Sequence, residues 1–154
     1  MIGIYRKIVF VLLAAASLAA CRNDIVYSRF IPMESGEWHI DSVAQFDYAI
    51  ADTVADYRML VYVRHTERYP YQNMWLFLGD SAHTDTIEFY LADDRGQWLG
   101  DRHHGFIEMP VLYEESRHYP DTGIYRLTIR HAMRDTLLRG ITDIGVEVMK
   151  MNNE

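Results

Sequence analysis

Cysteine is almost absent from this sequence. Among its 154 residues there is a single one, Cys21, so neither an internal disulfide nor a cysteine-based metal site can form. The sequence also lacks the Gly-x-Ser-x-Gly elbow of serine hydrolases, a glycine-rich phosphate loop and the His-Glu-x-x-His zinc motif. These absences leave histidine and carboxylate side chains as the candidates for any catalysis.

Positive charge is also scarce. Residues 1–20 hold two of the 15 lysine and arginine residues and none of the 22 acidic ones, so residues 21–154 carry 13 basic against 22 acidic side chains, a net charge of -9. This balance argues against nucleic acid as a partner and against an electrostatic grip on anionic lipid. Repeats and low-complexity tracts are missing too, and we expect one domain over residues 37–154.

No apolar run is long enough to cross a bilayer, which needs about 20 residues. The stretch 8–16 is apolar and follows Arg6 and Lys7, as in a secretory signal. The next segment, Leu18-Ala19-Ala20-Cys21, resembles the lipobox of bacterial lipoproteins, whose cysteine is acylated after the chain is cut before it. We therefore expect a signal peptide (1–20), lipid attachment at Cys21 and a tether (21–36). The alternative is a secreted protein whose cysteine lies near the cleavage site by chance.

Alternation of apolar and polar residues dominates the remaining chain. The pattern predicts half-buried strands with these inward residues: Phe46, Tyr48 and Ile50; Tyr57, Met59, Val61 and Val63; Ile87, Phe89 and Leu91; Tyr125, Leu127 and Ile129; Ile144, Val146 and Val148. Turn residues separate these segments. The fold class is therefore all-β: a single antiparallel β-sandwich, jelly-roll or immunoglobulin-like, of about seven or eight strands.

Three segments depart from simple alternation. Residues 75–78 are apolar on both faces, which predicts a central strand covered on both sides and places Trp75 in the core. A shorter strand, residues 106–109, is expected to end at Pro110. The one helical candidate is residues 131–138, because alanine, methionine, arginine and leucine cluster there before Gly140.

Metal and acid–base chemistry have weak candidates. Asp101, His103 and His104, with His83 and Asp85, offer zinc ligands, and a metal-dependent hydrolase is one hypothesis. Adjacent histidines in a strand point to opposite faces, however, so we expect no metal and no cofactor. Several glutamates could pair as general acid and base, but sequence does not set the separation of their carboxyl groups. These glutamates are Glu88, Glu108, Glu114 and Glu115.

Aromatic residues in loops are the better indication of binding. Tyr69 and Tyr71 flank Pro70, and Trp98 lies in a turn-rich segment, so their rings could be exposed and anchor a protein or stack on a sugar. Core filling is the competing role. A carbohydrate-binding lipoprotein that uses Tyr71 and Trp98 is the alternative function.

Several segments resemble the GldH family of gliding-motility lipoproteins, in the same order and over nearly the whole of residues 38–147. They are Tyr69-Pro70-Tyr71-Gln72-Asn73, Trp75-Leu76-Phe77, Asp85-Thr86, Leu91-Ala92-Asp93, Gly96-Gln97-Trp98-Leu99-Gly100, Gly123-Ile124-Tyr125, Met133-Arg134 and Gly140-Ile141-Thr142-Asp143-Ile144-Gly145.

The resemblance implies a Bacteroidota cell-envelope lipoprotein that takes part in surface gliding, a process linked to type IX secretion, and it implies no enzymatic activity. We expect envelope proteins of that machinery as partners, bound through Tyr69, Tyr71, Asn73, Trp98 and Arg134. The residues after Cys21 lack a dense acidic cluster like that of surface-exported lipoproteins in this phylum. The expected location is therefore the outer membrane, facing the periplasm.

Overall fold

The computed structural model describes residues 24–80 and 82–151, which form eleven strands and one short 3-10 helix joined by turns and loops. The elements are β1 (Ile25–Pro32), η1 (Glu34–Gly36), β2 (Glu37–His39), β3 (Ala44–Ile50), β4 (Asp56–His65), β5 (Asn73–Gly79), β6 (Thr84–Tyr90), β7 (Asp101–Arg102), β8 (Ile107–His118), β9 (Gly123–His131), β10 (Leu137–Arg139) and β11 (Ile141–Lys150). This confirms the all-β prediction. Within the described residues, no helix is long and apolar enough to span a bilayer. The expected signal peptide and Cys21 lie outside the described residues.

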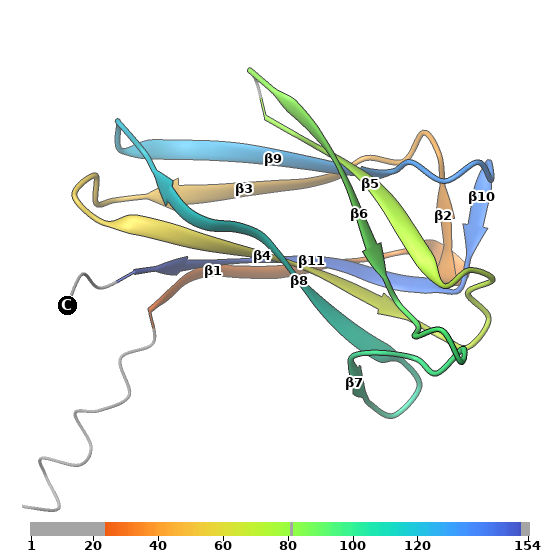
Figure 1. The fold of residues 1–154 in the computed structure, drawn as a ribbon. Helices are drawn as coiled ribbons and strands as arrows, with labels where there is room; N and C mark the ends of the chain where they lie inside the picture. Colours follow the sequence, from red (N-terminus) through yellow and green to blue (C-terminus); the bar gives the residue numbers. More distant parts are fainter. Residues whose placement is uncertain (1–23, 81, 152–154) are drawn as a thin grey trace, which may run out of the picture.

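Two antiparallel sheets form the layers of a sandwich (Figure 1). One has the order β1-β11-β4-β8-β7 and the other β3-β9-β5-β6. The eight long strands pair in a nested way, because β1 pairs with β11, β3 with β9, β4 with β8, and β5 with β6. This nesting is the arrangement of a jelly roll, so of the two predicted sandwich types the chain adopts that one.

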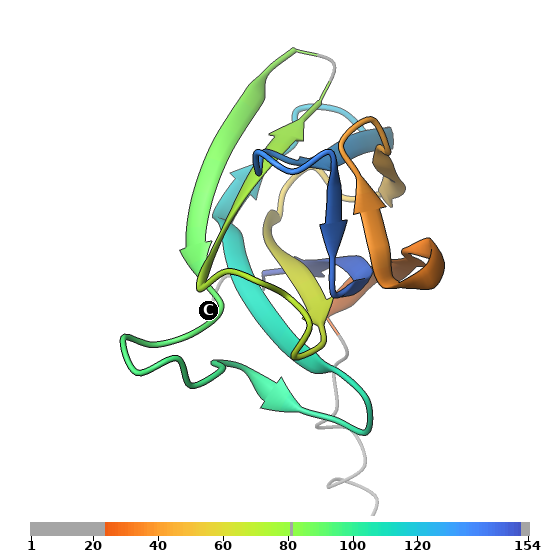
Figure 2. The same cartoon turned by 90° about the vertical axis from the view of Figure 1, so that its right-hand side faces the viewer.

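The core fills the space between the sheets. Alternate residues of β3 and β4 are buried, as the period of two requires, and Phe46, Val61 and Val63 are fully covered. The inward residues predicted for β11 are also fully buried. The short pair β2–β10 lies across the mouth between the sheets, seen end-on in Figure 2, and closes it with Trp38 and Leu138.

The strand registers define two ends of the sandwich. The β1 end is the end at which Ile25, Ile50, Asp56, His118, Gly123 and Lys150 lie. The β2 end is opposite and holds β2, β10 and the start of β5 (Figure 1). Because β4 has ten residues, the two ends are separated by about 30 Å.

The segment expected to be a tether is largely part of the fold. Residues 25–32 form β1, which pairs along its length with β11. The mixed polarity of this segment reflects an edge strand with most side chains exposed, and that pattern hides its period of two.

Three further expectations are corrected. Residues 131–138 form no helix, because β9 runs to His131 and the backbone N–H of Ala132 donates to the Trp75 carbonyl oxygen at 2.8 Å. Strand β8 continues through Pro110, since β7 pairs only with Ile107 and Glu108 and leaves that edge free beyond them. Trp75 is outside the core, with 37% of its surface exposed, because β5 is covered on one face only.

The glycine in the β10–β11 turn lies close to the backbone of Arg68 and Tyr69, in the loop between β4 and β5. Gly140 has φ +83°, and a Cβ there would lie 2.4 Å from the Tyr69 backbone nitrogen. Gly96 has a similar φ of +75° but no atom within 4 Å of such a Cβ. We expect Gly140→Ala to lower the free energy of unfolding by about 3 kcal/mol and Gly96→Ala by about 1 kcal/mol, measured by urea denaturation. Equal losses would show that the close approach at Gly140 does not matter.

Two buried histidines make the stability depend on pH. Burial lowers the pKa of His65 and of His131 below the ordinary 6.5, against a smaller opposing effect of their hydrogen bonds. Arg102 also lowers the pKa of His65, whereas Asp135 raises and His39 lowers that of His131. Below about pH 6.5 the two imidazoles become protonated in the unfolded chain but stay neutral in the folded protein. The free energy of unfolding therefore falls as the pH drops below about 6.5.

The expected result is a free energy of unfolding that decreases from pH 7.5 to pH 5 and a smaller decrease in His131→Phe. Urea denaturation at each pH measures it. The control is His104→Phe, which replaces an exposed ring and should keep the parent's pH dependence. An unchanged dependence in His131→Phe would contradict this account.

Candidate functional site

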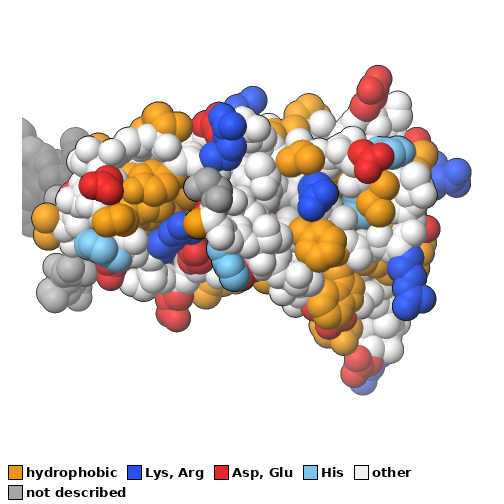
Figure 3. All heavy atoms as spheres, turned by 90° about the horizontal axis from the view of Figure 1, so that it is seen from above, with side chains coloured by type: hydrophobic (Ala, Val, Ile, Leu, Met, Phe, Trp, Pro, Cys, Tyr) orange, Lys and Arg blue, Asp and Glu red, His pale blue; other side chains and the backbone are white. Residues whose placement is uncertain are grey.

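The outer face of the sheet β3-β9-β5-β6 carries exposed aromatic rings. On β5 the outward positions are Asn73, Trp75 and Phe77, and both rings are 37% exposed. Figure 3 views this face and shows hydrophobic side chains gathered on the right of the view, with basic side chains beside them. We call this surface the aromatic face. Its residues are Tyr71, Trp75, Phe77, Tyr90, Arg130, Met133 and Arg134.

A groove of about 490 Å³ lies at one side of the aromatic face, near the β2 end. It runs between the start of β5 and the segment after β9, and is lined by Tyr71, Asn73, Trp75, Ala132, Met133 and Arg134. The backbone N–H of Trp75 donates to the Met133 sulfur at 3.3 Å. The Tyr71 hydroxyl donates to an Asp135 carboxylate oxygen at 2.6 Å. These contacts hold the non-helical segment after β9 against the start of β5 and the loop before it.

Three of the five predicted binding residues meet in this groove, namely Tyr71, Asn73 and Arg134. Tyr69 lies beneath it: its ring is buried, lies edge-on to Tyr71 at 5.9 Å, and its hydroxyl donates to the Asn73 carbonyl oxygen at 2.7 Å. Burial raises the pKa of Tyr69, so the hydroxyl stays protonated. Tyr69 thus supports the surface from below and is not itself exposed.

Trp98 is separated from the groove. Its ring is half-buried and packs edge-on against His65, with 4.7 Å between ring centroids. Tyr69 lies on the groove side of the same cluster, 6.5 Å from Trp98. Tyr71 and Trp98 therefore do not form the pair of exposed rings that the carbohydrate hypothesis requires.

Sequence reasoning missed the two exposed rings that β5 contributes to the aromatic face. The sequence predicted that Trp75 and Phe77 lie in a strand covered on both sides. The arrangement places the Arg130 guanidinium 5.9 Å from the Phe77 ring centroid. The period of two on β5 could have shown that both rings share one face, but not that this face is uncovered.

Two arginines and two carboxylates lie on or beside the aromatic face, so acidic and basic side chains are balanced there, in contrast to the acidic chain. Among the described residues, Arg130 and Arg134 take part in none of the ion pairs. The neighbouring carboxylates accept hydrogen bonds from neutral donors, Glu88 from the Asn73 amide at 2.7 Å and Asp135 from Tyr71. Tryptophan, tyrosine and arginine are the residues that most often carry binding energy at protein interfaces.

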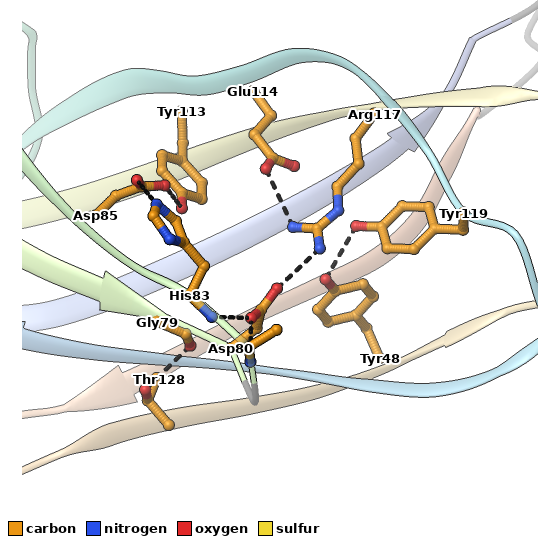
Figure 4. Close-up of polar contacts among 11 residues, drawn as sticks. Tyr48, Gly79, Asp80, His83, Asp85, Tyr113, Glu114, Arg117, Tyr119 and Thr128 are labelled. Carbon is orange, nitrogen blue, oxygen red and sulfur yellow. Dashed lines mark hydrogen bonds and ion pairs between the residues drawn. The ribbon is translucent and has the colours of Figure 1, made fainter.

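A second polar cluster joins β8 to the β5–β6 hairpin (Figure 4). Arg117 forms ion pairs with Asp80 at 2.9 Å and with Glu114 at 3.0 Å. Hydrogen bonds from the backbone N–H groups of residues 82 and 83, together with Arg117, lower the pKa of Asp80. Asp85 accepts from Tyr113 at 2.7 Å and contacts His83.

The pKa of Glu114 is raised, because burial of its carboxyl group outweighs the lowering effect of the contact with Arg117. Beside this pair, the hydroxyls of Tyr48 and Tyr119 lie 2.9 Å apart in the core. The side chains of this cluster bond mainly to one another, and their arrangement holds β8 across the open side of the sandwich. We assign it a structural role.

The described residues contain no group of three histidine, cysteine or acidic side chains placed to hold a metal ion. The proposed zinc ligands are dispersed: His83 bonds to Asp85, and the His103 ring stacks on Phe106 at 5.0 Å. The candidate acid–base glutamates also have other contacts, since Glu108 bonds to Arg64 and Glu88 to Asn73.

Comparison with known proteins agrees with the resemblance. The model of the GldH lipoprotein family matches residues 25–148. Gliding motility lipoprotein GldH of Flavobacterium johnsoniae is 30% identical over 149 residues, covering 89% of this chain and 92% of that protein. The gliding motility lipoprotein GldH homolog of Christiangramia forsetii is 28% identical over 147 residues, covering 88% and 90%. The chain therefore belongs to the GldH lipoprotein family, whose members are lipid-anchored proteins of the cell envelope.

Proposed function

We propose that this lipoprotein is a non-catalytic scaffold or accessory component of gliding-motility and type IX secretion machinery. Its relatives are named gliding motility lipoproteins, and the family is not known for enzymatic activity. The observation that carries the proposal is the aromatic face. Its exposed rings of Trp75 and Phe77, with Arg130 and Arg134 beside them, have the composition of a protein interface.

The position of the aromatic face supports the docking of a partner protein at a distance from the membrane. The groove beside Tyr71 and Asn73 lies towards the β2 end, whereas β1 begins at the opposite end. In this proposal the lipid is attached to Cys21, the domain faces the periplasm from the outer membrane, and the aromatic face is presented to envelope proteins. The lack of an acidic cluster in Arg22-Asn23-Asp24 supports the periplasmic orientation.

Carbohydrate binding is the alternative use of the same face. The exposed Trp75 ring has the Asn73 amide and the Glu88 carboxylate near it, on β5 and the neighbouring β6. A sugar that stacked on the ring could exchange hydrogen bonds with those groups. A change of tryptophan fluorescence with envelope glycans, abolished by Trp75→Ala, would favour this alternative.

The double variant Trp75→Ala/Phe77→Ala tests the docking surface. Because truncation of interface aromatics commonly costs 2 kcal/mol or more, we expect the partner's affinity to fall at least about tenfold. Colony spreading and protein secretion should fail in a strain that carries the variant in place of the native gene. Co-purification of cross-linked envelope proteins measures the loss directly.

The matched control is Leu112→Ala on β8, which removes a side chain that is 52% exposed and lies outside the aromatic face. It should keep spreading, secretion and co-purification, and both variants should reach normal membrane levels. Normal spreading and an undiminished set of cross-linked proteins in the double variant would refute the proposal.

A further inference from the structure

The most exposed large hydrophobic side chains of the described residues lie at the β1 end. Val54, in the turn between β3 and β4, is 84% exposed, and Ile124, next to the turn between β8 and β9, is 72% exposed. Ile25 and Val26 begin β1 at the same end and are 44% and 45% exposed. Figure 1 shows both turns and the start of β1 together, on the left.

Both turns are held in fixed shapes. The Asp52 carboxylate accepts hydrogen bonds from the backbone N–H of Val54 at 2.8 Å and forms an ion pair with Lys150 at 2.6 Å. In the other turn, the Tyr125 hydroxyl donates to the Asp121 carbonyl oxygen at 2.8 Å. The exposure of Val54 therefore belongs to an ordered turn, and that of Ile124 to the start of β9, where it pairs with Ala49.

The length of chain before β1 determines what lies near this end. Three residues, Arg22 to Asp24, separate Cys21 from Ile25, so a lipid on Cys21 is at most about 14 Å from the start of β1. The β2 end is about 30 Å farther along the strands. A bilayer that holds this lipid can reach the β1 end but not the β2 end when the sandwich stands upright.

We propose that the β1 end rests on the bilayer and that Val54 and Ile124 insert between the lipid headgroups. The proposal rests on the lipid attachment proposed above for Cys21. Two isolated hydrophobic side chains, one in a turn and one at the start of a strand, suit a lipid surface better than a protein partner, because a stable protein interface buries about 800 Å² on each side. The ion pair of Asp52 with Lys150 neutralises one carboxylate there, and Asp56 lies 3.4 Å from a His118 ring nitrogen. Asp24 and the exposed Asp121 also lie at the level of the headgroups.

This placement fixes the orientation of the domain. Acyl chains supply the affinity, while the two turns act as further contact points that limit tilting about the short connection. The aromatic face, towards the β2 end, is then held away from the bilayer.

Depth-dependent quenching tests the proposal on the full lipidated protein. Cys21 is the only cysteine and is acylated in this proposal, so Val54→Cys and Ile124→Cys each add one reactive thiol for a fluorophore. The labelled proteins are reconstituted in phosphatidylethanolamine–phosphatidylglycerol vesicles with brominated acyl chains. We expect the fluorescence at both positions to be quenched and shifted to the blue.

Val43→Cys is the matched control, since Val43 is 50% exposed in the turn before β3 at the β2 end. Its label should keep its full intensity. Unquenched labels at 54 and 124 on vesicle-bound protein, or equal quenching at 43, would overturn the proposal. An unmodified thiol at Cys21 in mass spectrometry would overturn it together with the anchor. A failure of docking through the aromatic face would leave the quenching unchanged, so the two proposals fail separately.

Discussion

The pairing of β1 with β11 is the interaction on which the arrangement of this molecule depends. It joins the first long strand to the last, completes the nested order of the jelly roll and covers one edge of β11. The inward side chains of β11, such as Ile144 and Val146, are then buried against the second sheet. Because β1 starts only a few residues after Cys21, the same pairing decides which end of the sandwich lies next to the lipid that we propose for Cys21.

Much of the fold could be predicted from sequence because its sheets each bury one face. Strands β3, β4, β9 and β11 show the alternation that a half-buried strand requires, and their inward residues were identified correctly. Strand β1 was missed because an edge strand with most side chains exposed loses that signal. The short strands β2 and β10 hold only three residues each, too few to show a period.

The candidate site was predicted less well, for a physical reason. Loop aromatics near Pro70 did lead to the groove, and Tyr71, Asn73 and Arg134 do line it. Whether a ring is exposed depends on which other strand or loop packs over it. The residues next to the ring in the sequence do not show which distant segment that is. Hence Tyr69 is buried and Trp75 is exposed, the reverse of the simplest expectation for each. The cluster of Arg117 with Asp80 had no signal at all, since it forms only where β8 crosses to the β5–β6 hairpin.

The position of β1 has a mechanical consequence. If one end of the molecule is tied to a membrane and a moving partner pulls on the other, tension runs along the strands. The hydrogen bonds between β1 and β11 are perpendicular to that direction, so the pull loads the whole ladder in shear and does not peel it apart one bond at a time. An edge strand in this geometry can transmit traction from a motile apparatus to a lipid without unravelling from its own terminus.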